Sequence, residues 1–167
     1  MRIIGIDPGY AITGFGIIEY VGNKFKVLEF GVISTPSGTP FEKRLLKISE
    51  DLDSLIKKYK PDSMAVEELF FSRNTTTAIG TAQARGVAIL TGAKAGIDVY
   101  EYTPLEVKMA VSGYGRADKN QIQQMVKVLL NLKEIARPDD ASDGLAVAIC
   151  HAHTGLNSSF LTKGGFH

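Results

Sequence analysis

Four carboxylates stand where their side chains can meet: Asp7, Glu67, Asp140 and Asp143. Asp7 and Glu67 each end a short apolar segment, and ligand sites in α/β sheets lie beyond the carboxyl ends of parallel strands. Asp140 and Asp143 are three residues apart at the start of a helical segment, so both project from one face. Converging carboxylates repel one another unless cations neutralise them, and Mg²⁺ prefers such oxygen ligands. The pattern is typical of a site for two ions about 3.5–4 Å apart that hydrolyses phosphodiesters.

Each acid also has an ordinary structural interpretation. Asp7 precedes Pro-Gly and can simply start a turn, while Asp139 or Asp140 can cap a helix. Alternation along so short a strand does not decide whether Glu67 or Glu68 faces a site. The hypothesis therefore depends on the four acids converging, and convergence depends on the fold.

The segment from Asp7 to Gly14 has a second interpretation. It resembles the first phosphate loop of actin-like and sugar-kinase-like ATPases. Those proteins close two lobes on a nucleotide, whereas 167 residues hold one lobe and no second loop of that type follows. The ATPase interpretation is therefore disfavoured.

The elements that must position these acids follow from apolar spacing. Alternating apolar and polar residues, together with short continuous apolar runs, predict five strands. Apolar residues at helical spacing predict four helices, one of them capped by Asp118. The strands are expected at 2–7, 13–20, 25–34, 63–67 and 97–102, and the helices at 41–59, 74–95, 118–130 and from 139 onward. The order is βββαβαβ followed by two helices. It predicts an α/β fold with a mixed five-stranded sheet, three antiparallel strands and then parallel ones, flanked by helices. A right-handed crossover places the strand ending at Glu67 beside the first strand.

Composition predicts one globular domain, residues 1–156, with a flexible C-terminal tail at 157–167. The chain is 44% hydrophobic and 22% charged, which excludes disorder, collagen and coiled coil. No apolar run approaches the ~18–20 residues of a membrane span, and Asp7 interrupts the apolar start too early for a signal peptide. The single Cys150 excludes an internal disulfide and suits a reducing compartment, so a cytoplasmic location is expected. The net charge is only +1, but residues 113–137 are basic.

Four ordered pieces of the chain resemble the bacterial Holliday junction resolvases of the RuvC family. They are Gly5-Ile6-Asp7-Pro8-Gly9, Ala65-Val66-Glu67, Gln83-Ala84-Arg85-Gly86-Val87-Ala88 and Asp140-Ala141-Ser142-Asp143. The resemblance implies a ribonuclease H-like fold and selects Glu67 over Glu68. It makes Asp7, Glu67, Asp140 and Asp143 the catalytic carboxylates that bind Mg²⁺, two ions per site, with Mn²⁺ able to substitute. It further implies a homodimer that nicks four-way junction DNA symmetrically in recombination and repair, together with the branch-migration proteins RuvA and RuvB.

The resemblance also assigns DNA-binding residues. Phe70 matches the family's stacking aromatic, and a base on an exposed ring is worth about 1–3 kcal/mol; Phe71 is expected to anchor its loop. Lys108 and Lys119 match basic residues near the scissile phosphate, and Arg73 lies in the Phe70 loop. Lys119 has independent support, because a cation in the first turn of a helix opposes the helix dipole and is a poor choice for stability. Lys108 alone reads as an ordinary surface charge.

One departure from the family concerns Gly144, which stands where alanine is usual, and this bears on how tightly the last helix packs. His151 and His153 do not share a helix face and have no cysteine or acid at ligand spacing, so a zinc site is not expected.

Two other functions are alternatives to junction resolution. A ribonuclease H-like nuclease that processes pre-16S ribosomal RNA fits the Phe70 loop and the Asp140/Asp143 pair less well. A catalytically silent junction-binding protein has no use for four acids beside phosphate.

Overall fold

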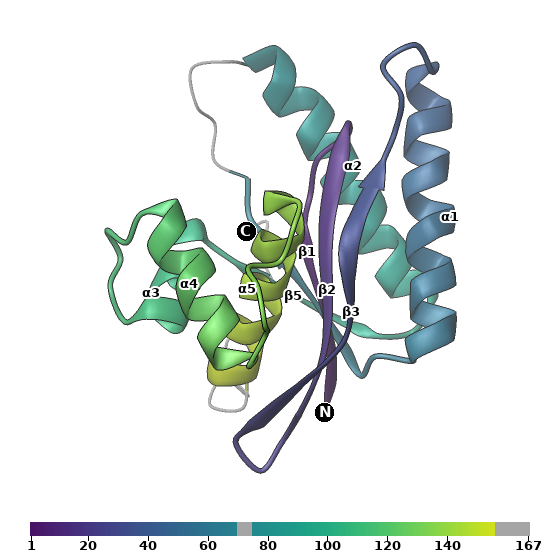
Figure 1. Ribbon diagram of the computed structural model, residues 1–167. Coiled ribbons are helices and arrows are strands. Elements are labelled where there is room, and N and C mark those ends of the chain that lie inside the picture. Colours follow the sequence, from purple (N-terminus) through teal and green to yellow (C-terminus); the bar gives the residue numbers. More distant parts are fainter. Residues whose placement is uncertain (70–74, 156–167) are drawn as a thin grey trace, which may run out of the picture.

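The computed structural model describes residues 1–69 and 75–155 of the chain. The expectations for Phe70, Phe71, Arg73 and the tail at 157–167 lie outside these residues. Five strands form one mixed sheet in the order β3-β2-β1-β4-β5 (Figure 1), as predicted. Their bounds are β1 Arg2–Asp7, β2 Ile12–Val21, β3 Lys24–Ser34, β4 Ser63–Glu67 and β5 Asp98–Tyr102.

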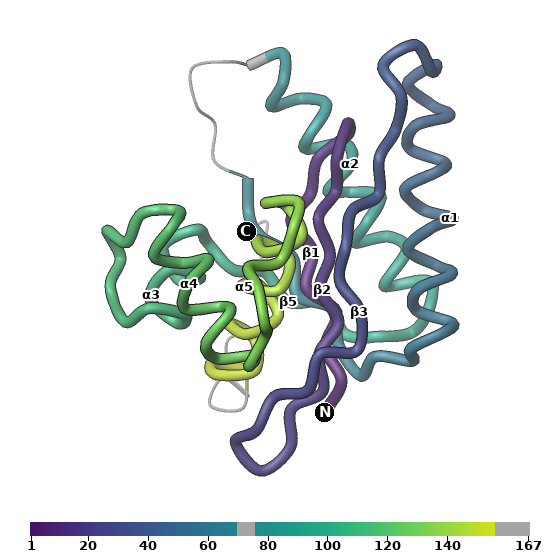
Figure 2. The backbone as a smooth tube through the Cα atoms, in the orientation of Figure 1, coloured from purple at the N-terminus to yellow at the C-terminus, as the bar shows by residue number. Residues whose placement is uncertain are grey.

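The first three strands form an antiparallel meander. The β2–β3 turn contains Gly22 and Asn23, both with positive φ of 57° and 60°, which is the backbone of the two-residue hairpin turns that match strand twist. Figure 2 shows this hairpin extending beyond the rest of the sheet. The meander makes β1 a central strand, with β2 antiparallel on one side.

The other neighbour of β1 is the parallel strand β4, reached through helix α1 (Phe41–Tyr59). Ile6 of β1 pairs with Val66 of β4, so the next residues, Asp7 and Glu67, end adjacent strands at the same edge of the sheet. Helix α2 (Thr75–Lys94) then leads to β5, which is parallel to β4. The expected position of β4 beside β1 is confirmed.

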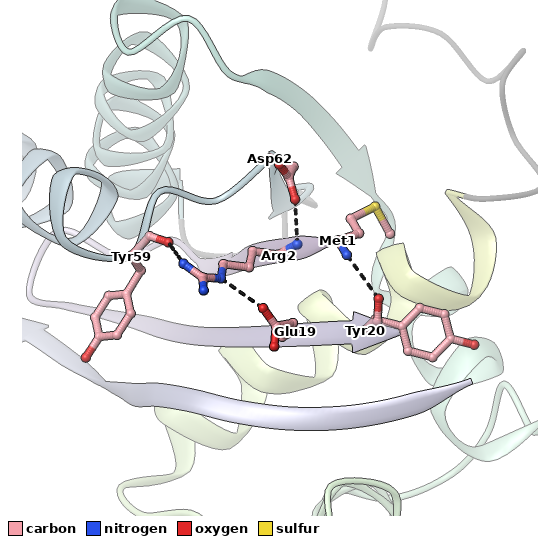
Figure 3. A network of polar contacts seen from close by, with 6 residues as sticks. All are labelled: Met1, Arg2, Glu19, Tyr20, Tyr59 and Asp62. Atoms are coloured by element: carbon pink, nitrogen blue, oxygen red, sulfur yellow. Dashed lines mark hydrogen bonds and ion pairs between the residues drawn. The ribbon is translucent and has the colours of Figure 1, made fainter. Parts of the chain in front are cut away.

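Polar contacts around Arg2 fasten the opposite end of β1 (Figure 3). The Arg2 Nη1 donates to the carbonyl of Tyr59 at 2.9 Å, and its Nε is 3.1 Å from Glu19 Oε1. The backbone N–H of Arg2 donates to Asp62 at 2.7 Å. These bonds join β1 to β2 and to the α1–β4 connection, and so help to hold the register that aligns Asp7 with Glu67.

Helices cover both faces of the sheet, because successive strand residues point to opposite sides. Ile4 and Ile6 pack towards α1 and α2, while Ile3 and Ala65 pack towards the other helices (Figure 1). Those other helices are α3 (Pro104–Ser112), α4 (Lys119–Leu129) and α5 (Asp139–Thr154). By the same alternation, Asp7 and Glu67 face α5.

Helix α5 crosses β1 and β2 at very short range. A Cβ added to Gly5, Gly14 or Gly16 would lie 2.6 Å or less from the nearest atom of α5. From the helix side, a Cβ on Gly144 would lie 2.6–2.8 Å from three backbone atoms of Phe15. Glycines on both surfaces therefore allow the backbones to approach, and this contact brings the first turn of α5 to the carboxyl end of β1.

Helix α3 corrects the sequence-based prediction, which placed two helices after the last strand where the structure has three. The helix has nine residues, and only Val107 and Val111 are buried, so it shows too few apolar positions for a periodic signal. Thr103 and Glu106 form a capping box, with Glu106 N donating to Thr103 Oγ1 at 3.1 Å. That Thr-Pro-Leu-Glu sequence was the signal available.

Among the described residues, no helix has both the length and the apolar content that crossing a membrane requires.

Candidate active site

The structure brings the four predicted carboxylates together at the carboxyl ends of β1 and β4. Carboxylate oxygens of Asp7, Asp140 and Asp143 all lie within 4.8 Å of one another. Glu67 lies near enough to Asp7 for its charge to raise the pKa of Asp7. Two acids come from adjacent strands and two from the first turns of α5, so the convergence depends on strand register and on the close packing of α5.

Burial among like charges disfavours the ionised form of these acids. Burial, followed by the charges of Glu67 and Asp143, raises the pKa of Asp7 to about 9. Burial also raises the pKa of Glu67 and of Asp143. Without a cation Asp7 therefore retains its proton at neutral pH, and a bound cation would displace it.

The donor set fits hard divalent cations. All four groups are carboxylates, and an ion such as Mg²⁺ prefers oxygen ligands and keeps water or phosphate in its remaining positions. The raised pKa values of Asp7 and Asp143 also fit a cation site. They show that the protein's own groups do not fully compensate the negative charge of these carboxylates.

A cleft of about 320 Å³ opens over Asp7, Glu67 and Asp143. Lys108 and Lys119 line it as well. The Lys119 Nζ lies 4.0 Å from Asp143 Oδ2, and Lys108 is close enough to Glu67 for its charge to oppose the rise in that pKa. The cleft therefore combines acids at its floor with two cations at its wall, which suits a phosphate held between bound metal ions and lysines.

Lys119 is the first residue of α4, where the helix dipole disfavours a cation. The capping box holds this helix start, with Asp118 and Gln121 exchanging two hydrogen bonds of 2.8 Å. The cap predicted at Asp118 is confirmed. Its structural role is to fix the helix end that presents Lys119 to the cleft.

Asp139 and Asp140 do not cap α5. The capping position is Pro138, which makes no side-chain hydrogen bond, and both acids lie inside the first helical turn. Asp139 instead contacts Lys119 Nζ at 3.3 Å and also pairs with Arg137. Sequence reasoning missed this contact, because residues 119 and 139 lie in different helices and nothing in their spacing indicates proximity.

Arg85, from the third family-like piece, lies on the other side of the same strand ends. It pairs with Glu101 of β5 and lines a small cavity of about 90 Å³ that also reaches Asp7 and Glu67. Arg85 is mostly buried, so its role here is to hold α2 against β5.

The histidines have partners away from the carboxylates. His151 is buried, its Nδ1 is hydrogen bonded to the Tyr102 hydroxyl at 2.6 Å, and burial lowers its pKa to about 4. His153 Nδ1 donates to the Ala110 carbonyl at 3.0 Å. Both therefore fasten α5 to neighbouring elements.

Comparisons with known proteins agree with this site. The family model described as "Crossover junction endodeoxyribonuclease RuvC" matches residues 3–151. The chain is 59% identical to the protein of that name from Alkaliphilus oremlandii over 155 residues, 93% of this chain and 94% of the relative. It is 57% identical to that from Alkaliphilus metalliredigens over 164 residues, 98% and 100% of the two chains.

Among solved structures, the fold superposes on Thermus thermophilus RuvC in complex with a Holliday junction substrate. The TM-score is 0.88, with 34% identity over 93% of this chain and 94% of that one. The match over nearly the whole length, joined to the carboxylate cluster at the strand ends, establishes that this chain belongs to the RuvC family of crossover junction endodeoxyribonucleases.

Proposed function

We propose that this protein resolves four-way DNA junctions by hydrolysing phosphodiester bonds at the carboxylate cluster of Asp7, Glu67, Asp140 and Asp143. The observation that carries the proposal is the convergence itself. Carboxylate oxygens of Asp7, Asp140 and Asp143 lie within 4.8 Å of one another, beside a cleft that Glu67, Lys108 and Lys119 also line. Family membership supplies the substrate, since the relatives are named crossover junction endodeoxyribonucleases.

The four carboxylates would hold two Mg²⁺ ions, with Mn²⁺ as a substitute. Such ions activate water and stabilise the leaving 3′ oxygen when bound. Asp7 is the best placed to contact both positions, because it lies within reach of Glu67 on one side and of Asp140 and Asp143 on the other. Its burial disfavours the bare anion, so a bound cation would take the place of the proton that Asp7 otherwise keeps.

Lys108 and Lys119 would orient the substrate. Their ammonium groups can pair with non-bridging phosphate oxygens and offset the charge that develops during attack. The lysines approach from α3 and α4, and the acids approach from the sheet and α5. A phosphate in the cleft is thereby contacted from opposite sides.

The remaining assignments follow from the resemblance. Phe70 would stack on an unpaired base at the junction centre, with Arg73 contacting backbone nearby. We further propose that the protein acts in the cytoplasm as a homodimer, so that two sites cut opposite strands, and that it works with RuvA and RuvB. Sedimentation with and without junction DNA tests the dimer.

The decisive experiment compares a labelled four-way junction with linear duplex of the same sequence. Each substrate is incubated with Mg²⁺, with EDTA, and with the Asp7→Asn variant. Asp53→Asn is the matched control, because Asp53 is a carboxylate of α1 on the far face of the sheet, ion-paired to Lys57 at 2.5 Å. We expect paired nicks on the junction alone, lost in EDTA and in Asp7→Asn, and retained in Asp53→Asn.

Two outcomes would contradict the proposal. Tight junction binding without cleavage in Mg²⁺ would make the protein a binding module. Equal cleavage of duplex and junction, or activity on structured RNA alone, would move it to another ribonuclease H-like function.

A further inference from the structure

The carboxylate of Asp139 is paired with cations from two parts of the chain. Lys119 Nζ, at the start of α4, lies 3.3 Å from one of its oxygens, and Arg137, before α5, pairs with the other. The buried Nε2 of Gln123, four residues after Lys119 in α4, has no hydrogen-bond partner within the described residues.

Stability does not account for this arrangement. The side chains of Lys119, Asp139 and Arg137 are 59%, 41% and 65% exposed, and ion pairs so exposed contribute little to folding. Both Lys119 and Asp139 are also the first residues of their helices. The helix dipole favours the acid at such an end and opposes the lysine.

The donors match what a phosphate group takes. A guanidinium and an ammonium, each paired with one carboxylate oxygen beside two helix N-termini, are groups that bind backbone phosphates. The position adjoins the active-site cleft, because Lys119 lines that cleft and lies 4.0 Å from Asp143. A DNA strand bound over the carboxylate cluster would therefore pass beside Lys119 and its Asp139 contact.

We propose that Arg137 and Lys119 form a second phosphate-binding position for the cleaved strand, occupied by the Asp139 carboxylate until DNA displaces it. This inference rests on the proposed function, because it takes the bound molecule to be junction DNA. It assigns Arg137 a DNA contact, and it makes Asp139 a residue that holds the two cations in position while competing with the phosphate.

The inference is tested by measuring junction binding against salt concentration. Fluorescence anisotropy with a labelled four-way junction in EDTA, from about 50 to 200 mM KCl, avoids cleavage and gives the slope that counts phosphate contacts, about 0.9 for each. The variants are Arg137→Gln, Arg137→Lys, Asp139→Asn and the Arg137→Gln/Asp139→Asn double variant. Lys57→Gln and Asp53→Asn are matched controls, because they form an exposed pair on the opposite face of the sheet.

We expect Arg137→Gln to weaken binding about three- to tenfold at low salt and to lower the slope by about one, and Arg137→Lys to restore the slope. Asp139→Asn should tighten binding by a similar factor, because it frees both cations. In the double variant that gain should shrink, since one of the two cations is gone. The control variants should bind like the wild type.

Two results would overturn the inference while leaving the proposed function intact. One is that Arg137→Gln lowers the melting temperature but keeps the wild-type slope, which would make the pair structural. The other is that Asp139→Asn weakens binding. If the wild type itself neither binds the junction in this assay nor cleaves it in Mg²⁺, the proposed function fails, and this inference fails with it.

Discussion

Replacing Gly144 by alanine should push α5 away from the sheet and misplace the neighbouring Asp143. The added Cβ would lie 2.6 Å from the carbonyl carbon of Phe15 and 2.7 and 2.8 Å from its Cα and N, whereas ordinary contacts begin at 3.4 Å. These are backbone atoms of a central strand, so they cannot rotate away. The helix itself has to move.

Two opposing terms set the size of the effect. Alanine stabilises a helix interior by about 1 kcal/mol relative to glycine. Overpacking against a rigid neighbour costs about 1–3 kcal/mol. We therefore expect a net loss of up to about 2 kcal/mol, with the melting temperature falling about 2–4 °C for each kcal/mol. Because a displacement of 1 Å at a catalytic group can cost about 100-fold, junction cleavage should fall about 10- to 100-fold.

The assay pairs thermal melting with single-turnover cleavage of a four-way junction in Mg²⁺. Gly38→Ala is the matched control, since an added Cβ there meets nothing within 4 Å. It should leave both measurements unchanged. If Gly144→Ala melts and cleaves like Gly38→Ala, then the short distance between α5 and β2 does not position Asp143, and the reasoning is refuted.

Three further predictions follow from the charges. The raised pKa of Asp7 means that the folded protein holds its proton more tightly than the unfolded chain, so stability in EDTA should fall as pH rises from about 4 to about 9. Asp7→Asn should remove that slope, raise stability at pH 8 by at least about 1 kcal/mol, and abolish the melting shift that Mg²⁺ gives the wild type. His151 behaves oppositely: its pKa of about 4 against an ordinary 6.5 means that stability is lost as pH falls from about 6.5 to about 4, by about 3 kcal/mol in total. His151→Gln should flatten that part of the profile in urea unfolding, and an unchanged profile would contradict the assignment. Lys108→Gln should slow cleavage about 10- to 100-fold with little change in melting temperature, whereas Lys57→Gln should do neither; equal rates for the two variants would show that Lys108 does not act on the phosphate.

Local sequence signals predicted most of the sheet. Asp7 and Glu67 follow apolar runs bounded by turn residues, so the local sequence pattern alone predicts that they lie at strand ends. Parallel pairing followed from the intervening helix, which has to cross over before the next strand. The Asp118 cap was equally visible, because capping depends on a few adjacent residues.

The features that the sequence does not predict depend on contacts between distant segments of the chain. Whether Glu67 or Glu68 faces the cleft is set by pairing with β1, and within this chain only the fold settles it. The approach of α5 needs glycines on two strands and on the helix to coincide in space, although Gly144 alone looked like a small departure. The contact between Lys119 and Asp139 joins two helix starts that are twenty residues apart in sequence, and no periodicity links them.

The buried thiol of Cys150 makes α5 open to a direct kinetic measurement. It is the only cysteine of the chain, its side chain is fully buried, and burial raises its pKa to about 12. A thiol reagent can therefore react only when the helix lifts from the sheet, and the labelling rate reports the free energy of that opening. The same helix carries Asp140 and Asp143. Slower labelling on adding Mg²⁺ or junction DNA would therefore measure how much each ligand stabilises the packed helix, without any label placed near the site.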